Sequence, residues 1–309
     1  MMKDNVRVGL LNFTGMAMNK WINLVFIFVF LSFSCTGLYV SSLIEPIKES
    51  ETYHIIHKDT KIYYHTIGDK SNPPVVFLHG ILGFTQAYRD IIEILAEKYY
   101  IIGIDMRGHG RSSIGNQSYS YQLIAEDVIR VTDQIGVNRF HVIGHSGGGI
   151  VLLSIAKYFP DKIIKGVSIA SLYNQDGISY RKGQDDYITK EGFKDNVDGR
   201  NNRLVKFYDR VYKKLGEEEK FIKTKKTLME FGTDMFPSFS ESDLHKIENP
   251  MLVIVAGDDD RIKPDHTKKM SGLLPNSTLL EVPKAKHFNI VKRKKNLNIV
   301  LDRIFNFLK

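Results

Sequence analysis

The feature that most restricts the fold is a repeated alternation of unbroken apolar segments with amphipathic ones. Six short segments consist almost wholly of strand-forming residues: PVVFL, YIIGI, FHVIG, IIKGVSI, MLVIVA and TLLEV. Most are followed by a stretch with apolar residues at helical spacing, such as YQLIAEDVIRVTDQIG at 121–136. Strands without polar alternation are buried on both faces, and a helix between successive strands makes them parallel. The sequence therefore predicts an α/β fold, with a mostly parallel sheet between two helical layers.

Two departures from this alternation set the expected organisation. The segment YHIIHKDTKIYYHTIGD at 53–69 alternates in polarity around Lys58-Asp59-Thr60 and predicts an antiparallel hairpin. Between about 173 and 248 the sequence is polar, with a helical pattern and no strand pattern. An interruption of that length between two strands is too long for a loop and predicts a helical cap. We expect one domain over 51–309 with this insertion, after an N-terminal segment over 1–50. Thr85 is the expected N-cap of the helix at 85–99.

The composition excludes some classes of protein. A chain of 309 residues that is 43% hydrophobic is long enough for one large core. Its single cysteine, Cys35, excludes an internal disulfide framework. The net charge of +8 comes from scattered lysines and arginines. The densest basic run, at 292–295, has no aromatic residues interleaved, so a solvated helix face is favoured over a nucleic-acid site. The charge is also compatible with a position near anionic lipid.

The N-terminal segment has the pattern of a membrane-targeting sequence. No charged residue occurs from Trp21 to Ile44, and positive charges precede this stretch. The length suits a membrane span whose basic end stays inside. A start at Met18 would instead give a secretory signal, and Ser34-Cys35 then resembles a lipoprotein cleavage site. Anchor and lipoprotein stay open, as does plain cleavage. Each predicts that the domain over 51–309 is attached to the membrane or lies beyond it, on the extracytoplasmic side.

Gly144-His145-Ser146-Gly147-Gly148 lies between a predicted strand and a predicted helix. This is the context in which G-x-S-x-G forms a nucleophile elbow, whose glycines permit close backbone approach. A hydroxyl needs a base to become a good nucleophile. His287 follows the last predicted strand, and three aspartates at 258–260 follow the strand before it. All would lie at the carboxyl edge of the sheet, where such folds place their sites.

Five motifs together resemble the α/β-hydrolase superfamily, in its capped branch: LHG at 78–80, DMRGHGRS at 105–112, GHSGG at 144–148, GDDDRIKP at 257–264, and His287. The resemblance implies a serine nucleophile, Ser146, a base, His287, and an acid. The family's spacing of Gly257 and Pro264 selects Asp260 as the acid, with Asp259 as the alternative. It also implies an oxyanion hole formed by the backbone N–H groups of Ile81 and Gly147. Five other residues are expected to brace loops rather than to react: His79, Asp105, Arg107, His109 and His145.

The sequence thus predicts a serine hydrolase for a small acyl substrate, cleaving a carboxylic ester, thioester or lactone through an acyl-enzyme. Acyl transfer, perhydrolysis and carbon–carbon bond hydrolysis remain open on the same triad, as does a membrane-tethered binding protein without activity. Epoxide and halide chemistry is disfavoured, because relatives with those activities carry an aspartate where Ser146 stands. No spacing suggests a metal or cofactor, and GHGRSS lacks the lysine of a phosphate-binding loop. A group of five residues would line an acyl pocket or form the core of the cap: Met229, Phe231, Met235, Phe236 and Phe239.

Overall fold

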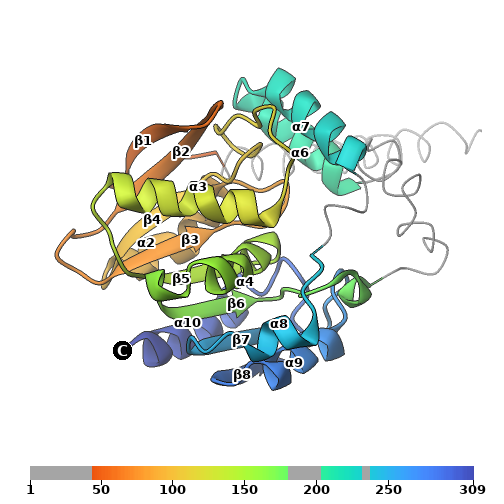
Figure 1. The fold of residues 1–309 in the computed structure, drawn as a ribbon. Coiled ribbons are helices and arrows are strands. Elements are labelled where there is room, and N and C mark those ends of the chain that lie inside the picture. The colour runs from red at the N-terminus through yellow and green to blue at the C-terminus, as the bar shows by residue number, and fades with distance from the viewer. Residues whose placement is uncertain (1–43, 180–202, 232–236) are drawn as a thin grey trace, which may run out of the picture. The chain divides into compact units, whose positions relative to one another are not determined.

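One eight-stranded sheet forms the centre of the protein (Figure 1). The computed structural model describes residues 44–179, 203–231 and 237–309, which belong to one compact unit, Leu43–Lys309. The strand order is β1-β2-β4-β3-β5-β6-β7-β8. The strands are β1 (Glu51–His57), β2 (Thr60–Ile67), β3 (Pro74–Leu78), β4 (Tyr100–Ile104), β5 (Phe140–His145), β6 (Ile163–Ile169), β7 (Met251–Ala256) and β8 (Ser277–Val282).

The sheet is parallel from β4 to β8 and antiparallel at its first edge. β1 pairs with β2 as the predicted hairpin, and β2 runs antiparallel to β4. The pairs β3–β4, β3–β5, β5–β6, β6–β7 and β7–β8 are all parallel. The central strands are buried throughout, as their unbroken apolar sequences predict. The predicted α/β fold with a mostly parallel sheet is confirmed.

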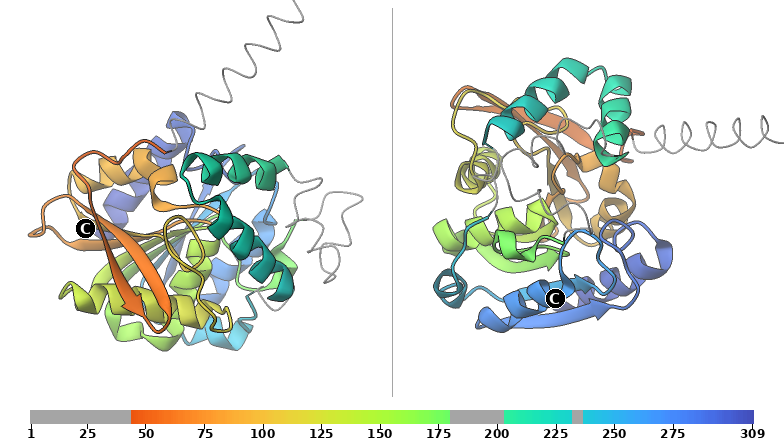
Figure 2. Two further views of the ribbon diagram at one scale, coloured as in Figure 1. Left: turned by 90° about the horizontal axis from the view of Figure 1, so that it is seen from above. Right: turned by 90° about the vertical axis from the view of Figure 1, so that its right-hand side faces the viewer.

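Helices cover both faces of the sheet (Figure 2). α3 (Tyr121–Gln134) packs against α4 (Gly147–Tyr158), and α10 (Lys294–Leu308) contacts α2 (Arg89–Ala96). α9 (Pro264–Leu273) lies against β7 and β8, and the short α8 (Glu241–His245) contacts α9. Ser120 caps α3, since its side chain accepts from the N–H of Leu123.

The helix at 85–99 begins differently from the prediction. A 3₁₀ turn, η1 (Thr85–Tyr88), precedes α2, and no side chain caps either element. Thr85 is buried, and its backbone N–H donates instead to the Asp105 carboxylate at 2.8 Å. Thr85 therefore starts a 3₁₀ turn and joins two loops at the carboxyl edge, but it does not cap α2.

In the long interval between β6 and β7, two described helices precede the short α8: α6 (Arg203–Lys214) and α7 (Glu218–Phe231). They dock on the loops that follow β3 and β4. The Tyr212 hydroxyl accepts from the N–H of Gly110 at 2.7 Å, and the Thr224 hydroxyl donates to the Gly108 carbonyl at 2.6 Å. The Tyr212 ring also stacks on Phe221, with centroids 4.3 Å apart. The rest of the predicted cap includes residues 180–202 and 232–236, which lie outside the described residues.

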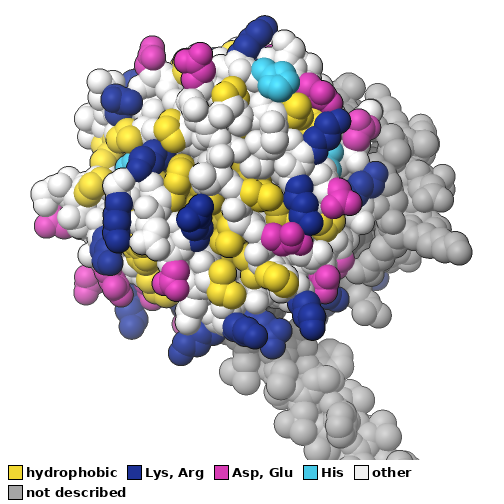
Figure 3. Space-filling model, turned by 90° about the horizontal axis from the view of Figure 1, so that it is seen from below, with side chains coloured by type: hydrophobic (Ala, Val, Ile, Leu, Met, Phe, Trp, Pro, Cys, Tyr) yellow, Lys and Arg dark blue, Asp and Glu magenta, His cyan; other side chains and the backbone are white. Residues whose placement is uncertain are grey.

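The predicted N-terminal span also lies outside the described residues, apart from its last residue. Within residues 44–179, 203–231 and 237–309, no helix is both long enough and apolar enough to cross a bilayer. On the face shown in Figure 3, lysine and arginine side chains are interspersed with acidic and hydrophobic ones.

Candidate active site

Ser146 occupies a strained turn between β5 and α4. Its φ and ψ are 53° and −118°, a conformation that costs a non-glycine residue on the order of 1–3 kcal/mol. The turn is tight enough to exclude side chains at its glycines. A Cβ on Gly144 would stand 2.2 Å from the Gly148 carbonyl oxygen, and one on Gly148 would stand 2.2 Å from that of Leu78. The predicted elbow is therefore present, with the serine at the carboxyl end of a central strand.

The loop after β8 brings His287 to the serine. The His287 Nε2 lies 2.9 Å from the Ser146 Oγ, although 141 positions separate the two residues. The imidazole side chain is 4% exposed. Asn289 stabilises this loop, because its Oδ1 accepts from the N–H of Lys286 at 2.8 Å and from the Nδ2 of Asn296 at 2.9 Å. The two residues that the sequence predicts as nucleophile and base are within hydrogen-bond distance.

The carboxylate that contacts the His287 imidazole is that of Asp259, the alternative acid, where Asp260 was the expected one. The Asp259 Oδ2 lies 2.9 Å from the His287 Nδ1, and the Asp259 side chain is 3% exposed. Its Oδ1 accepts from the N–H groups of Arg261 at 2.8 Å and Ile262 at 3.0 Å. This local turn aims the other carboxylate oxygen at the imidazole. The Asp259 side chain thus both closes this turn and lies in the position expected for Asp260.

The hydrogen bonds specify the imidazole's tautomer. A carboxylate accepts only, so the Nδ1 of His287 carries the proton that faces Asp259. The Nε2 then has a free lone pair toward the Ser146 hydroxyl, which donates to it. This is the arrangement in which an imidazole takes a proton from a serine hydroxyl.

The backbone N–H groups of Ile81 and Gly147, the pair expected to form an oxyanion hole, lie close to the serine. Gly147 is the first residue of α4, so its N–H has no partner in the helix. Among the described residues, neither N–H donates a hydrogen bond. The two segments are close together: a Cβ on Gly147 would lie 3.1 Å from the Ile81 nitrogen, and one on Gly80 would lie 3.3 Å from the Ser146 Cβ.

The peptide that carries the Ile81 N–H is held from its other side. The Gly80 carbonyl accepts from the His79 Nδ1 at 2.8 Å and from the N–H of Gly83 at 2.9 Å. Because the peptide unit is planar and trans, fixing this carbonyl also fixes the opposite direction of the Ile81 N–H. His79 is itself oriented by the N–H of Met106, which donates to its Nε2 at 3.0 Å. Burial lowers the pKa of His79, so the ring stays neutral and keeps both roles. His79 thus braces a loop, as expected.

The residues after β4 also brace loops. Asp105 accepts from the N–H groups of Thr85 and Arg111 at 2.8 and 3.0 Å. The fully buried Arg107 forms a bidentate pair with Asp127, at 2.8 and 2.7 Å. The Nδ1 of His109 donates to the Arg107 carbonyl at 2.9 Å. No contact between any of these three side chains and Ser146 or His287 occurs among the described residues, which is consistent with their expected structural roles.

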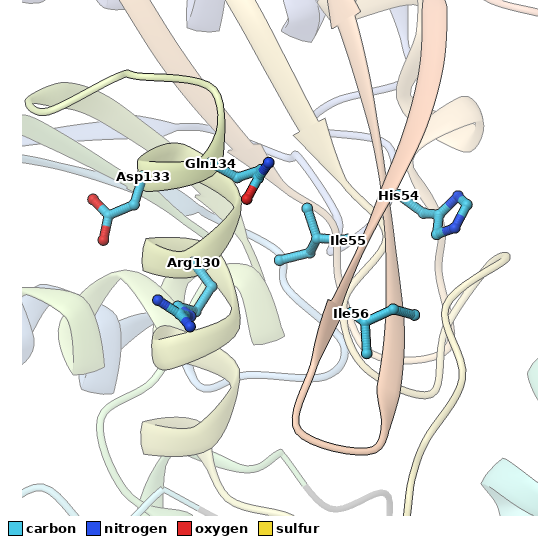
Figure 4. Close-up of a pocket in the computed structure, with 6 residues that line it drawn as sticks. All are labelled: His54, Ile55, Ile56, Arg130, Asp133 and Gln134. Carbon is cyan, nitrogen blue, oxygen red and sulfur yellow. The ribbon is translucent and has the colours of Figure 1, made fainter.

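A surface depression of about 440 Å³ lies elsewhere, between β1 and α3 (Figure 4). Six residues line it: His54, Ile55, Ile56, Arg130, Asp133 and Gln134. The His54 and Asp133 side chains point away from the space between the two elements. Asp133 pairs instead with Lys162 at 2.6 Å. The polar groups do not converge, so the candidate active site stays with Ser146.

The five residues assigned to an acyl pocket or a cap core are only partly described. Phe239 is 8% exposed, and its N–H donates to the Tyr173 carbonyl at 3.1 Å. The Phe239 side chain also lines a small depression beside Tyr119 and Lys157. The side chains of Met229, Phe231, Met235 and Phe236 lie outside the described part of the chain. Both interpretations of this group stay predictions.

Comparison with known proteins supports the fold. The family model for the alpha/beta hydrolase fold matches residues 73–293. The bifunctional esterase/perhydrolase DCH of Acinetobacter calcoaceticus is 27% identical over 248 residues, which cover 73% of this chain and 89% of DCH. Epoxide hydrolase 4 of Mus musculus is 28% identical over 116 residues, which cover 36% of this chain and 32% of that protein. The chain spans only about a third of the length of the first curated relatives it matches.

A solved structure agrees over most of the chain. Carboxylesterase CesB from Bacillus subtilis superposes with a TM-score of 0.67 at 19% sequence identity, covering 90% of this chain and 97% of CesB. At that identity the similarity concerns the fold. The match to the family model extends over more than half of the chain and includes the elbow, the Asp259 turn and His287. The chain therefore belongs to the alpha/beta hydrolase fold family.

Proposed function

We propose that the protein is a serine hydrolase that cleaves a carboxylic ester, thioester or lactone. One observation supports this most strongly. The Ser146 hydroxyl, the His287 imidazole and the Asp259 carboxylate form a continuous line of hydrogen bonds, each 2.9 Å long. This line stands beside two backbone N–H groups that make no other hydrogen bond within the described residues.

The proposed reaction has two stages. His287 removes the proton from the Ser146 hydroxyl as the oxygen attacks the acyl carbonyl, and the oxyanion accepts from the N–H groups of Ile81 and Gly147. The imidazolium then protonates the leaving alcohol or thiol, and an acyl-enzyme on Ser146 remains. Water, deprotonated by His287, attacks this ester. The imidazolium then returns the proton to the Ser146 oxygen as its bond to the acyl carbon breaks, and the acid is released. Asp259 keeps the proton on Nδ1 throughout and stabilises the imidazolium. Each oxyanion donor contributes on the order of 10²–10³ in rate.

The named relatives support the ester class over epoxide opening. DCH is named as an esterase/perhydrolase and CesB as a carboxylesterase. The similarity to Epoxide hydrolase 4 does not carry its chemistry over, because epoxide-opening relatives use an aspartate at the position of Ser146. A serine at that position gives an acyl-enzyme from a carbonyl substrate.

A panel of p-nitrophenyl esters of rising acyl length tests this proposal. We expect the wild-type protein to release p-nitrophenol from at least the short esters. We also expect a fluorophosphonate probe to label it, with mass spectrometry placing the adduct on the peptide that contains Ser146. A folded wild-type protein that neither hydrolyses any ester nor takes up the probe would contradict the proposal, and would favour a binding protein.

We further propose that the segment before residue 51 attaches the domain to a membrane, either as a retained span or as a lipid on Cys35. The support is the sequence alone: a charge-free stretch that begins at Trp21 and follows several positive charges. Metabolic labelling with an alkynyl palmitate analogue, followed by fractionation, separates the two forms. Label that Cys35→Ser abolishes indicates a lipoprotein. Membrane association without label indicates a span, and a wholly soluble, unlabelled protein contradicts both.

A further inference from the structure

The His145 side chain connects the two halves of the candidate site from behind. His145 is fully buried, and its Nε2 lies 2.9 Å from the backbone carbonyl oxygen of His287. Its Nδ1 lies 2.8 Å from the hydroxyl of Tyr88, which is also buried. That hydroxyl accepts from the N–H of Gly80 at 3.1 Å. The line of contacts therefore begins one residue before the Ile81 N–H and ends on the residue that carries the base.

The direction of each hydrogen bond follows from the groups involved. The His287 carbonyl accepts only, so the Nε2 of His145 carries the proton. Its Nδ1 is then an acceptor, and the Tyr88 hydroxyl donates to it while accepting from Gly80. Every donor and acceptor along the line has a partner. Burial lowers the pKa of His145 to about 3, which keeps the ring in the neutral form that this pattern requires. Burial also raises the pKa of Tyr88, which keeps its proton.

The surroundings hold both rings in place. The His145 ring packs against the His287 ring, with centroids 5.0 Å apart, and against Phe288 at 6.2 Å. The Lys292 ammonium lies over the Tyr88 ring at 5.6 Å and donates to the carbonyl of Ala87. Lys292 thus makes a second connection between the His287 loop and the segment that follows Gly80. Buried polar groups linked in this way are costly to disrupt, which makes them suited to fixing geometry.

We propose that Tyr88 and His145 are positioning residues that set the His287 imidazole relative to the oxyanion donor at Ile81. This role rests on the proposed function, because it matters only if both groups act on one reacting carbonyl. Neither side chain touches the Ser146 hydroxyl in the described structure. They act on the backbone of Gly80 and of His287. A displacement of about 1 Å between catalytic groups is enough to lower a rate on the order of 10²-fold.

Tyr88→Phe is the first test, because it removes one oxygen and keeps the ring beneath Lys292. We expect kcat for p-nitrophenyl acetate to fall by about 10- to 100-fold while KM stays within about twofold. The rate of fluorophosphonate labelling at Ser146 should fall in parallel. Tyr99→Phe is the matched control: Tyr99 is buried too, but its ring stacks on Phe305 in α10 and takes no part in this line. It should keep the wild-type kcat.

A double-mutant cycle tests whether the two residues act as one unit. His145→Gln can place its amide N–H near the His287 carbonyl but has no acceptor at the position of Nδ1, the atom that faces Tyr88. If the line is continuous, the double variant should be no slower than the slower single variant, within about twofold. Additive losses, or a folded Tyr88→Phe with wild-type kcat and labelling rate, would overturn the proposal.

Nitrogen-15 NMR of the wild-type imidazoles gives a test that no folding defect can obscure. His145 should appear as the Nε2–H tautomer and should stay neutral from about pH 5 to 8, since its pKa is far below that range. An Nδ1–H tautomer, or titration of His145 within that range, would contradict the proposed line of hydrogen bonds. A wild-type protein that shows this tautomer but lacks activity and labelling would instead contradict the proposed function. Tyr88 and His145 would then have no reaction for which to position groups.

Discussion

Ser146→Ala is expected to abolish ester hydrolysis, with kcat reduced by about 10⁵- to 10⁶-fold, because no other group can form the acyl-enzyme. His287→Ala should cause a loss of the same order, since the hydroxyl then has no base at 2.9 Å. The double variant should be no slower than either single variant, because the two residues act as a unit. Stopped-time assays with p-nitrophenyl acetate and fluorophosphonate labelling measure all three.

Ser154→Ala is the matched control for this experiment. Ser154 lies two turns further along α4, is 1% exposed, and its hydroxyl has no hydrogen-bond partner within the described residues. Its replacement removes the same atom from the helix that follows Ser146, without touching His287. We expect wild-type activity and full labelling. Equal activity of Ser146→Ala and the wild-type protein, both folded by circular dichroism, would show that the reaction does not pass through Ser146.

The sequence predicts most of this fold because buried strands require apolar residues, and such residues are directly visible in the sequence. The central strands are enclosed on both faces, as the unbroken apolar runs at 100–104 and 251–256 and the largely apolar run at 140–145 indicate. The ends of the helices are less predictable than the strands. Thr85 has the residue type of a cap, but its N–H is taken by the Asp105 carboxylate, which is 20 positions away in sequence. A local pattern cannot register such a long-range contact.

The same distinction applies to the site. Ser146 and His287 are predictable because each follows a recognisable strand, and the topology brings the carboxyl ends of those strands to one edge. The choice among three consecutive aspartates depends on one turn, in which the N–H groups of Arg261 and Ile262 orient Asp259. The spacing of Gly257 and Pro264, which flank the turn on either side, does not resolve which aspartate it orients. The role of His145 was predicted only as loop bracing, and Tyr88 carries no motif at all.

Asp259→Asn is expected to lower kcat by about 10⁴-fold with little change in KM. The Asp259 Oδ1 accepts from two backbone N–H groups, so an asparagine will keep its carbonyl oxygen there. Its amide NH₂ then faces the His287 Nδ1, where it donates. The imidazole must accept at Nδ1 and carry its proton on Nε2, the atom that faces Ser146. In that tautomer His287 cannot take the serine proton, although the geometry is unchanged.

Asp260→Asn is the control that separates the two neighbouring carboxylates. It makes the same chemical change one residue later and leaves the carboxylate beside the imidazole in place, so kcat should stay within about tenfold of wild type. Thermal melting of both variants establishes that each is folded. A greater loss in Asp260→Asn than in Asp259→Asn would mean that the loop after β7 rearranges when substrate binds, so that Asp260 replaces Asp259 at Nδ1. The contact at 2.9 Å would then describe only the resting enzyme.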